Sequence, residues 1–331
     1  MSGFADIIGH EQVIEHLQSA IRMDRISHAY IFEGPDGAGK KMLAEAFAQA
    51  LQCEEGGNKP CGKCHSCVQA QSHSHPDIIY VTHEKPRTIR VDDIRQQINA
   101  DMAIRPYSSP YKIYIVDEAE KMNEAAQNAL LKTMEEPPEY GIILLLSTSS
   151  EVFLPTITSR CVTLKLRAVP DDEVTAYIIK KTGISKEKAD VCAAFAQGVI
   201  GKALLLAQSE DFTQVKEGAI QLIKRMNRID SHEMAQAIRQ INEYHMELTD
   251  YLDILAVWYR DVLRFKATQD ANDLILKDEA MEIKRQANLF SYAGLEAIIQ
   301  AIYQAKIRLR ANVNYDLTME LLFETIKEYQ K

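Results

Sequence analysis

Four cysteines stand close together in a part of the chain rich in turn-forming residues. They are Cys53, Cys61, Cys64 and Cys67. Four thiolates at such short spacing suit a tetrahedral Zn²⁺ ion, and a shell made only of thiolates is typical of a structural site. Three histidines stand nearby, namely His65, His73 and His75. The sequence therefore predicts a zinc module at about 53–67, held by four cysteines or by three cysteines and one histidine.

A second group of residues has the spacing of a phosphate-binding loop. The glycines Gly34, Gly37 and Gly39 precede Lys40, between an apolar run and a helical pattern. Glycines let the backbone N–H groups of such a loop turn inward around phosphates, and the dipole of the following helix favours negative charge. We expect Lys40 to reach the β- and γ-phosphates of a nucleotide.

The next residue breaks this pattern. A phosphate loop that holds Mg²⁺ carries Ser or Thr there, whose hydroxyl binds the metal, but this chain has Lys41. An ammonium group has no lone pair to offer a cation. We expect Lys41 to repel the metal on which phosphoryl transfer depends, and the sequence leaves open whether ATP and Mg²⁺ bind at all.

Two acidic residues complete the candidate nucleotide site. Asp117 and Glu118 follow the apolar run 112–116. An apolar strand that ends in Asp-Glu has the Walker-B form. In that form Asp117 lies on the metal side and Glu118 orients the attacking water.

The elements that must position these residues follow from the apolar periodicity. Five apolar runs are expected to be buried strands: 29–32, 77–81, 112–116, 142–147 and 162–166. Helical periods lie between them, at 43–51, at 91–102 and at 126–134, the last opened by Asn123 and stopped by Pro137 and Pro138. This alternation predicts a mostly parallel α/β sheet, with ligands at the carboxyl ends of its strands.

Only helical patterns remain after about residue 166. We therefore predict three parts: an α/β domain over 1–166, a small helical domain over 167–208 and a second helical domain over 209–331. Short helices are expected at 171–182 and 185–197, with a third that begins at Gly201. Cys192, on an apolar helix face, is expected to lie in the core.

The composition describes an ordinary globular chain. Its net charge is −9, whereas free-standing DNA-binding proteins are more often basic, so any contact with nucleic acid is expected to be local or indirect. The longest strongly apolar run, 142–146, is too short to span a bilayer, and the first residues lack the features of a secretory signal. We expect a cytoplasmic protein with no membrane role and reduced cysteines.

Several motifs together resemble those of bacterial clamp-loader subunits, which share the AAA+ ATPase fold. Besides the phosphate loop and the four cysteines, they lie at 4–10, 25–30, 128–138, 155–161 and 312–321. The resemblance covers nearly the whole chain. It implies an AAA+ α/β P-loop domain with an inserted zinc module, then an all-helical lid, then an all-helical collar through which subunits assemble.

Two departures from the family pattern affect one catalytic apparatus. The ATP-hydrolysing gamma/tau subunit has Thr at the position of Lys41, and it has an arginine where this chain has Gly201. The resemblance therefore implies a member without ATPase activity of its own. An active gamma/tau-type ATPase stays the alternative because Lys40, Asp117 and Glu118 are retained, and a zinc-stabilised scaffold is a third possibility.

The resemblance also implies a role for Arg160, which stands in a Ser-Arg-Cys signature. In this family that arginine acts in trans, as an arginine finger at the ATP site of a neighbouring subunit; its side chain is planar and permanently charged. The implied partners are the gamma/tau and delta subunits, with the sliding clamp and primer-template DNA reached through the complex. The implied setting is DNA replication by a DNA-directed DNA polymerase holoenzyme.

Overall fold

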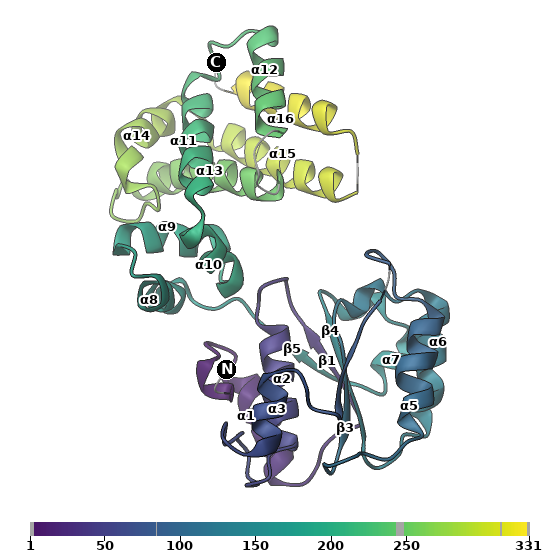
Figure 1. Cartoon of the computed structure of the whole chain (residues 1–331). Coiled ribbons are helices and arrows are strands. Elements are labelled where there is room, and N and C mark those ends of the chain that lie inside the picture. The colour runs from purple at the N-terminus through teal and green to yellow at the C-terminus, as the bar shows by residue number, and fades with distance from the viewer. Residues whose placement is uncertain (1–2, 84, 243–247, 312, 330–331) are drawn as a thin grey trace. The chain divides into compact units, whose positions relative to one another are not determined.

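The computed structural model describes residues 3–83, 85–242, 248–311 and 313–329 (Figure 1). The chain divides into two compact units. The first unit comprises 1–177 with 198–202, and the second comprises 178–197 with 203–331. The boundary thus crosses the segment predicted to be a separate lid, and a lid over 167–208 stays a prediction.

The first unit is built on a five-stranded parallel sheet in the order β2-β3-β4-β1-β5. Its strands are β1 (Ala29–Glu33), β2 (Ile78–Val81), β3 (Lys112–Val116), β4 (Gly141–Ser147) and β5 (Val162–Lys165). β3 and β4 are buried along their whole length, as expected for parallel strands covered on both faces. All five predicted strands are confirmed, with ends that shift by at most one residue.

Helices cover both faces of this sheet (Figure 1). One face packs against α1 (Glu11–Arg22) and α2 (Lys40–Leu51), through residues such as Leu17, Leu43 and Phe47. The other face packs against α4 (Val91–Ile94), α6 (Glu124–Glu135) and α7 (Pro155–Thr158).

Local signals set the ends of these helices. The Asn123 side chain accepts a hydrogen bond from the backbone N–H of Ala126 and so caps α6, as predicted. The predicted helix at 91–102 is a continuous helical path, in which the π-helix η2 (Arg95–Asn99) joins α4 to α5 (Ala100–Met102). α1, α3 (His65–Gln71) and α7 were not predicted from the sequence.

The second unit is helical throughout its described residues. It holds α9 (Lys186–Ala196), α11 (Glu210–Arg225), α12 (Ser231–Asn242), α13 (Leu248–Thr268), α14 (Ala280–Leu289), α15 (Tyr292–Arg310) and α16 (Tyr315–Tyr329). α8 (Asp171–Thr182) and α10 (Ile200–Gln208) cross the boundary between the units.

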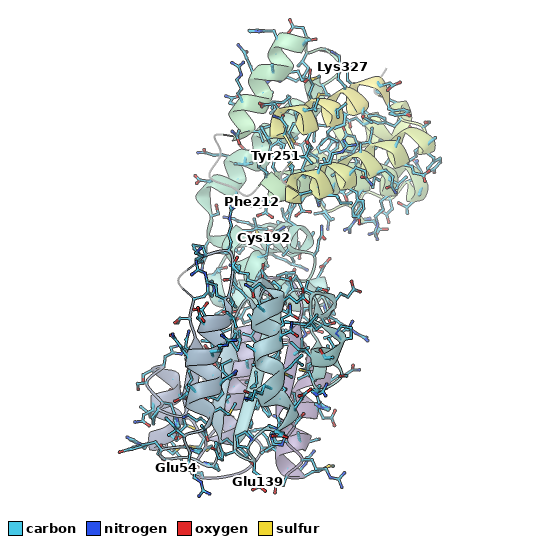
Figure 2. The ribbon with its side chains drawn as sticks, turned by 90° about the vertical axis from the view of Figure 1, so that its right-hand side faces the viewer. Glu54, Glu139, Cys192, Phe212, Tyr251 and Lys327 are labelled. Carbon is cyan, nitrogen blue, oxygen red and sulfur yellow. The ribbon has the colours of Figure 1, made fainter. Side chains whose placement is uncertain are left out.

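The core of the second unit includes residues of α9 and α11. Cys192 and Phe212 are both buried in this unit (Figure 2), and Phe195 meets the Phe212 ring edge-on. The burial of Cys192 is as predicted. In the ranges that the structure describes, no helix combines the length and apolar character needed to cross a membrane.

Candidate nucleotide site and metal centre

The four predicted cysteines come together at the start of α3. Their sulfur atoms all lie within 4.8 Å of one another, and within the described part of the chain they are the single such group of potential metal ligands. A tetrahedral site with Zn–S bonds of about 2.3 Å needs sulfur atoms about 3.8 Å apart. The Sγ atoms of Cys61 and Cys67 are already 3.9 Å apart. The donor set therefore fits zinc after a small contraction.

Backbone N–H groups donate hydrogen bonds to three of these four sulfur atoms. The N–H groups of Cys61, Cys64 and Cys67 donate to the Sγ atoms of Cys53, Cys61 and Cys64 over 3.3–3.4 Å. N–H donors favour the charged form of a thiol, and those of Lys63 and Cys64 lower the pKa of Cys61 to about 7, whereas burial raises the pKa of Cys53 and of Cys67. Thiolate is the form that binds a metal.

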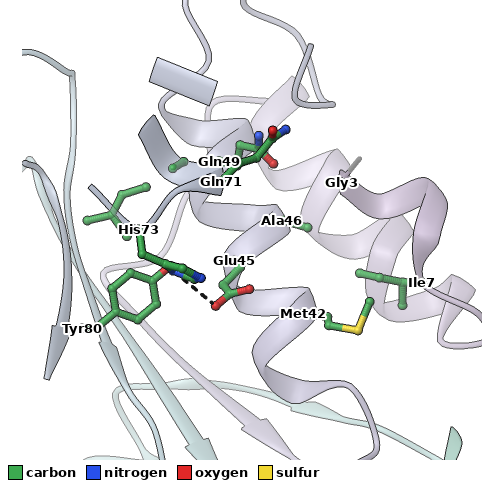
Figure 3. A pocket seen from close by; sticks show the side chains of 11 residues that line it. Gly3, Ile7, Met42, Glu45, Ala46, Gln49, Gln71, His73 and Tyr80 are labelled. Atoms are coloured by element: carbon green, nitrogen blue, oxygen red, sulfur yellow. Dashed lines mark ion pairs between the residues drawn. The ribbon is translucent and has the colours of Figure 1, made fainter. Parts of the chain in front are cut away.

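Two of the three alternative histidine ligands are engaged elsewhere. His75 is buried, with Nδ1 accepting from the Asp77 N–H and Nε2 bonded to the hydroxyl groups of Ser66 and Ser109. His73 faces a cleft between α2 and β2 (Figure 3), where its Nδ1 lies 3.9 Å from Glu45 Oε1. This arrangement favours the shell of four cysteines.

The phosphate loop lies at the carboxyl end of β1, between β1 and α2, as predicted. Gly37 and Gly39 have φ angles of 81° and 97°, in the region that favours glycine. The buried Lys40 ammonium donates to the loop itself: to the carbonyl oxygens of Gly34 and Pro35 at 2.6 and 3.2 Å, and to Asp36 Oδ1 at 3.1 Å. These three acceptors match the three donors of an ammonium group, so a bound phosphate would have to displace them.

Lys41 lies beside the acid on the metal side of the site. Its Nζ atom is 3.7 Å from Asp117 Oδ2. A positive charge thus stands next to the carboxylate that binds the metal in a Walker-B site. The structure therefore brings Lys41 and Asp117 together.

Glu118 is also paired within the chain. Its Oε2 lies 2.6 Å from Lys121 Nζ and 3.6 Å from His83 Nε2. Glu118 has a positive φ of 51°. These two contacts engage the carboxylate that a Walker-B site would use to orient water.

The segment 198–202 lies directly on the phosphate loop. The Gly201 N–H donates to the Gly37 carbonyl oxygen over 3.0 Å. A Cβ atom at Gly201 would come within 2.8 Å of the Cα and oxygen atoms of Gly37. Two backbones therefore meet here at a distance that only glycine permits.

Arg160 lies away from this site, in the turn between α7 and β5. Its Nη1 donates to the Thr156 carbonyl oxygen at 2.9 Å and its Nη2 to Glu135 Oε1 at 3.2 Å. The side chain is 37% exposed. The structure thus presents this guanidinium group at the surface.

Sequence reasoning missed three partners of these residues. Asp36 and Glu135 were not assigned to a site, although the spacing of Asp36 and Lys40 is that of a helical ion pair. The contact between Gly201 and Gly37 could not be predicted from the sequence. There Gly201 indicates only that the arginine of the family pattern is absent.

Comparison with known proteins gives the family of the chain. Residues 9–170 match the model described as DNA polymerase III, delta subunit, and residues 206–326 match the model of the C-terminal part of that subunit. The DNA polymerase III subunit delta' of Bacillus subtilis (strain 168) is 30% identical over 321 residues, which cover 96% of this chain and 96% of that protein. The chain belongs to the delta-prime family of DNA polymerase III clamp-loader subunits.

Other similar proteins are described as a subunit of DNA polymerase III or as related to one. The tau subunit of the same organism is 28% identical over 305 residues, which are 86% of this chain but only 54% of that relative. A DNA polymerase III gamma subunit-related protein from Thermotoga maritima is 18% identical and has a TM-score of 0.45, with 95% of this chain and 99% of that chain covered.

Proposed function

We propose that this delta-prime-type subunit supports ATP-dependent loading of the sliding clamp onto primed DNA without hydrolysing ATP itself. In the complex its Arg160 completes the ATP site of a neighbouring gamma/tau subunit. The proposal rests on the contrast between the chain's own candidate nucleotide site and Arg160. At the chain's own site Lys41 lies beside Asp117 and Gly201 contacts the phosphate loop, whereas Arg160 is presented at the surface.

The geometry of the phosphate loop supports the absence of hydrolysis. Phosphoryl transfer needs a metal ion between the phosphates and the Walker-B acid. Lys41 stands 3.7 Å from Asp117 and supplies a charge there, but it cannot coordinate the leaving group as Mg²⁺ does. The contact of Gly201 with Gly37 also covers part of the loop with backbone.

The position of Arg160 supports a role in trans. An arginine that serves a neighbour must reach beyond its own domain, and this one lies in a surface turn with its guanidinium group partly exposed. A planar guanidinium group can grip two phosphate oxygens at once. Such a finger contributes about 10³–10⁵ to the rate in related phosphoryl-transfer enzymes.

The helical unit supports assembly with other subunits. Six large apolar side chains are exposed on α15 and α16, and four of them form two pairs: Tyr303 with Ile307, and Leu317 with Leu321. The members of each pair are one helical turn apart, and the two helices pack against each other. Exposed apolar patches of this kind mark partner surfaces. We assign this surface to the predicted collar.

The cysteine cluster has a structural role in this proposal. A zinc ion held by Cys53, Cys61, Cys64 and Cys67 would supply fixed bonds between the end of α2 and α3. No step of ATP hydrolysis involves it.

The test compares ATPase activity of the purified chain with that of the assembled loader. We expect no Mg²⁺-dependent turnover by the chain alone and DNA-stimulated turnover by the complex. Steady turnover by the isolated chain that Lys40→Ala abolishes would instead identify a gamma/tau-type ATPase. Lys40→Arg is a useful control, because it keeps the positive charge inside the loop.

A further inference from the structure

Two helices hold the Arg160 guanidinium group from different sides. Thr156 belongs to α7 and offers its carbonyl oxygen to Nη1, and Glu135 is the last residue of α6 and offers Oε1 to Nη2. A guanidinium group has five N–H donors in a rigid plane. These two bonds fix the plane and leave its remaining N–H groups without a partner among the described residues.

The place of Glu135 in its helix is unfavourable unless a cation is near. The C-terminal end of a helix carries partial negative charge, so a carboxylate there is destabilising. α6 is set firmly in the fold by its Asn123 cap and by the buried Leu130 and Met134. Its last turn therefore presents Glu135 at a fixed point, and Arg160 offsets the repulsion.

We propose that Glu135 is a positioning residue for Arg160 in the reaction at the neighbouring ATP site. This inference rests on the in-trans role proposed above. A long, flexible side chain loses conformational freedom when it binds a phosphate, and a side chain already held in place loses less. Thr156 and Glu135 each hold one terminal nitrogen of the guanidinium group, and its remaining N–H groups, which no residue in the described ranges engages, are free to bind a phosphate.

Two other roles for Glu135 predict different kinetics. If the Glu135 carboxylate held Arg160 away from the neighbouring ATP site, removing that carboxylate would raise the ATPase rate of the complex. If the pair served stability alone, its removal would leave the kinetics of the complex unchanged. The sign of the kinetic effect distinguishes these roles from positioning.

The experiment uses the loader reconstituted from this chain with gamma/tau and delta subunits, the sliding clamp and primed DNA. The variants are Glu135→Ala, Glu135→Gln and Arg160→Ala. Glu136→Gln serves as the matched control, because Glu136 is the adjacent exposed acid and has no ion pair to Arg160 among the described residues. Assembly and thermal unfolding are measured first for each variant.

We expect Glu135→Ala to lower kcat for the Arg160-dependent part of the DNA-stimulated ATPase by about two- to fivefold, the rate ratio that corresponds to an exposed ion pair. The KM for ATP should not change. Glu135→Gln should lower kcat less than Glu135→Ala does, because its amide oxygen still accepts a hydrogen bond from Arg160 Nη2. Glu136→Gln should have the kcat of wild type. Glu135→Ala combined with Arg160→Ala should lose no more than Arg160→Ala alone.

Two outcomes would overturn the inference. If Glu135→Ala equals or exceeds wild type while Arg160→Ala loses activity, Glu135 does not position the finger and the proposed function stands. If Arg160→Ala itself has full activity, the in-trans role and this inference both fail.

Discussion

The contact between Gly201 and Gly37 leads to a prediction whose sign is unusual. Gly201 is the second residue of α10, a position where alanine normally forms helix better than glycine by about 1 kcal/mol. On helix propensity alone, Gly201→Ala should stabilise the protein. Its Cβ atom, however, would lie 2.8 Å from two backbone atoms of Gly37, which cannot rotate away.

Forcing an extra carbon into such a contact typically costs about 1–3 kcal/mol. Because both clashing atoms belong to the backbone, the cost should lie in the upper part of this range, about 2–3 kcal/mol. After the gain of about 1 kcal/mol in helix propensity, we expect Gly201→Ala to lower the free energy of unfolding by about 1–2 kcal/mol. Urea denaturation followed by circular dichroism measures this difference. Amide hydrogen exchange should also increase in the phosphate loop, because the bond from the Gly201 N–H to the Gly37 oxygen is strained or lost.

Gly294→Ala is the matched control. Gly294 also lies in the first turn of a helix, but the atoms nearest to its added Cβ are side-chain atoms of Ser291 and Tyr329 at 3.2 Å. These side chains can shift, so its effect should be close to neutral. A Gly201→Ala variant that is as stable as wild type, or more stable, would refute the reasoning about the contact.

Three further predictions follow from the site. Elemental analysis should give one zinc per chain, and Cys64→Ser should lose the metal while the second unit stays helical; metal-free protein purified without chelator would contradict this. Lys41→Thr should strengthen binding of Mg²⁺-nucleotide in a fluorescent-nucleotide titration yet restore little hydrolysis, even when combined with Gly201→Arg, because any side chain at 201 meets Gly37. Burial lowers the pKa of His75 below its ordinary 6.5, so its contribution to stability is present above about pH 6.5 and is lost as the pH falls below that value. The free energy of unfolding, measured by urea denaturation, should therefore decrease less on acidification for His75→Gln than for wild type. Equal decreases would contradict a contribution of buried, neutral His75 to stability.

Much of the first unit could be predicted because its strands are buried on both faces. Runs such as 112–116 and 142–147 are apolar throughout, and their lengths fit strands. α1 was not predicted although Val13, Ile14, Leu17 and Ile21 recur at helical spacing and pack on the core, so this helix could have been predicted from the sequence. α3 was missed because it lies within the cysteine segment, where turns dominate the local signal.

The candidate site could be predicted where its residues lie close together in the sequence. The four cysteines and the phosphate loop are examples, since their spacing is local. The contacts that modify the site are not local. Glu135 contacts Arg160, and Gly201 contacts Gly37, only because the fold brings segments together that are far apart in the sequence.

The central claim is that the chain acts at a neighbour's ATP site and not at its own. The most direct test compares Arg160→Ala, Lys40→Ala and Glu118→Ala in one reconstituted loader, with assembly checked first. We predict that Arg160→Ala assembles normally, since exposed charges contribute little to stability, and loses part of the DNA-stimulated ATPase and clamp loading, while the other two variants stay close to wild type. An Arg160→Ala loader with full activity, beside large losses for Lys40→Ala and Glu118→Ala, would contradict the account.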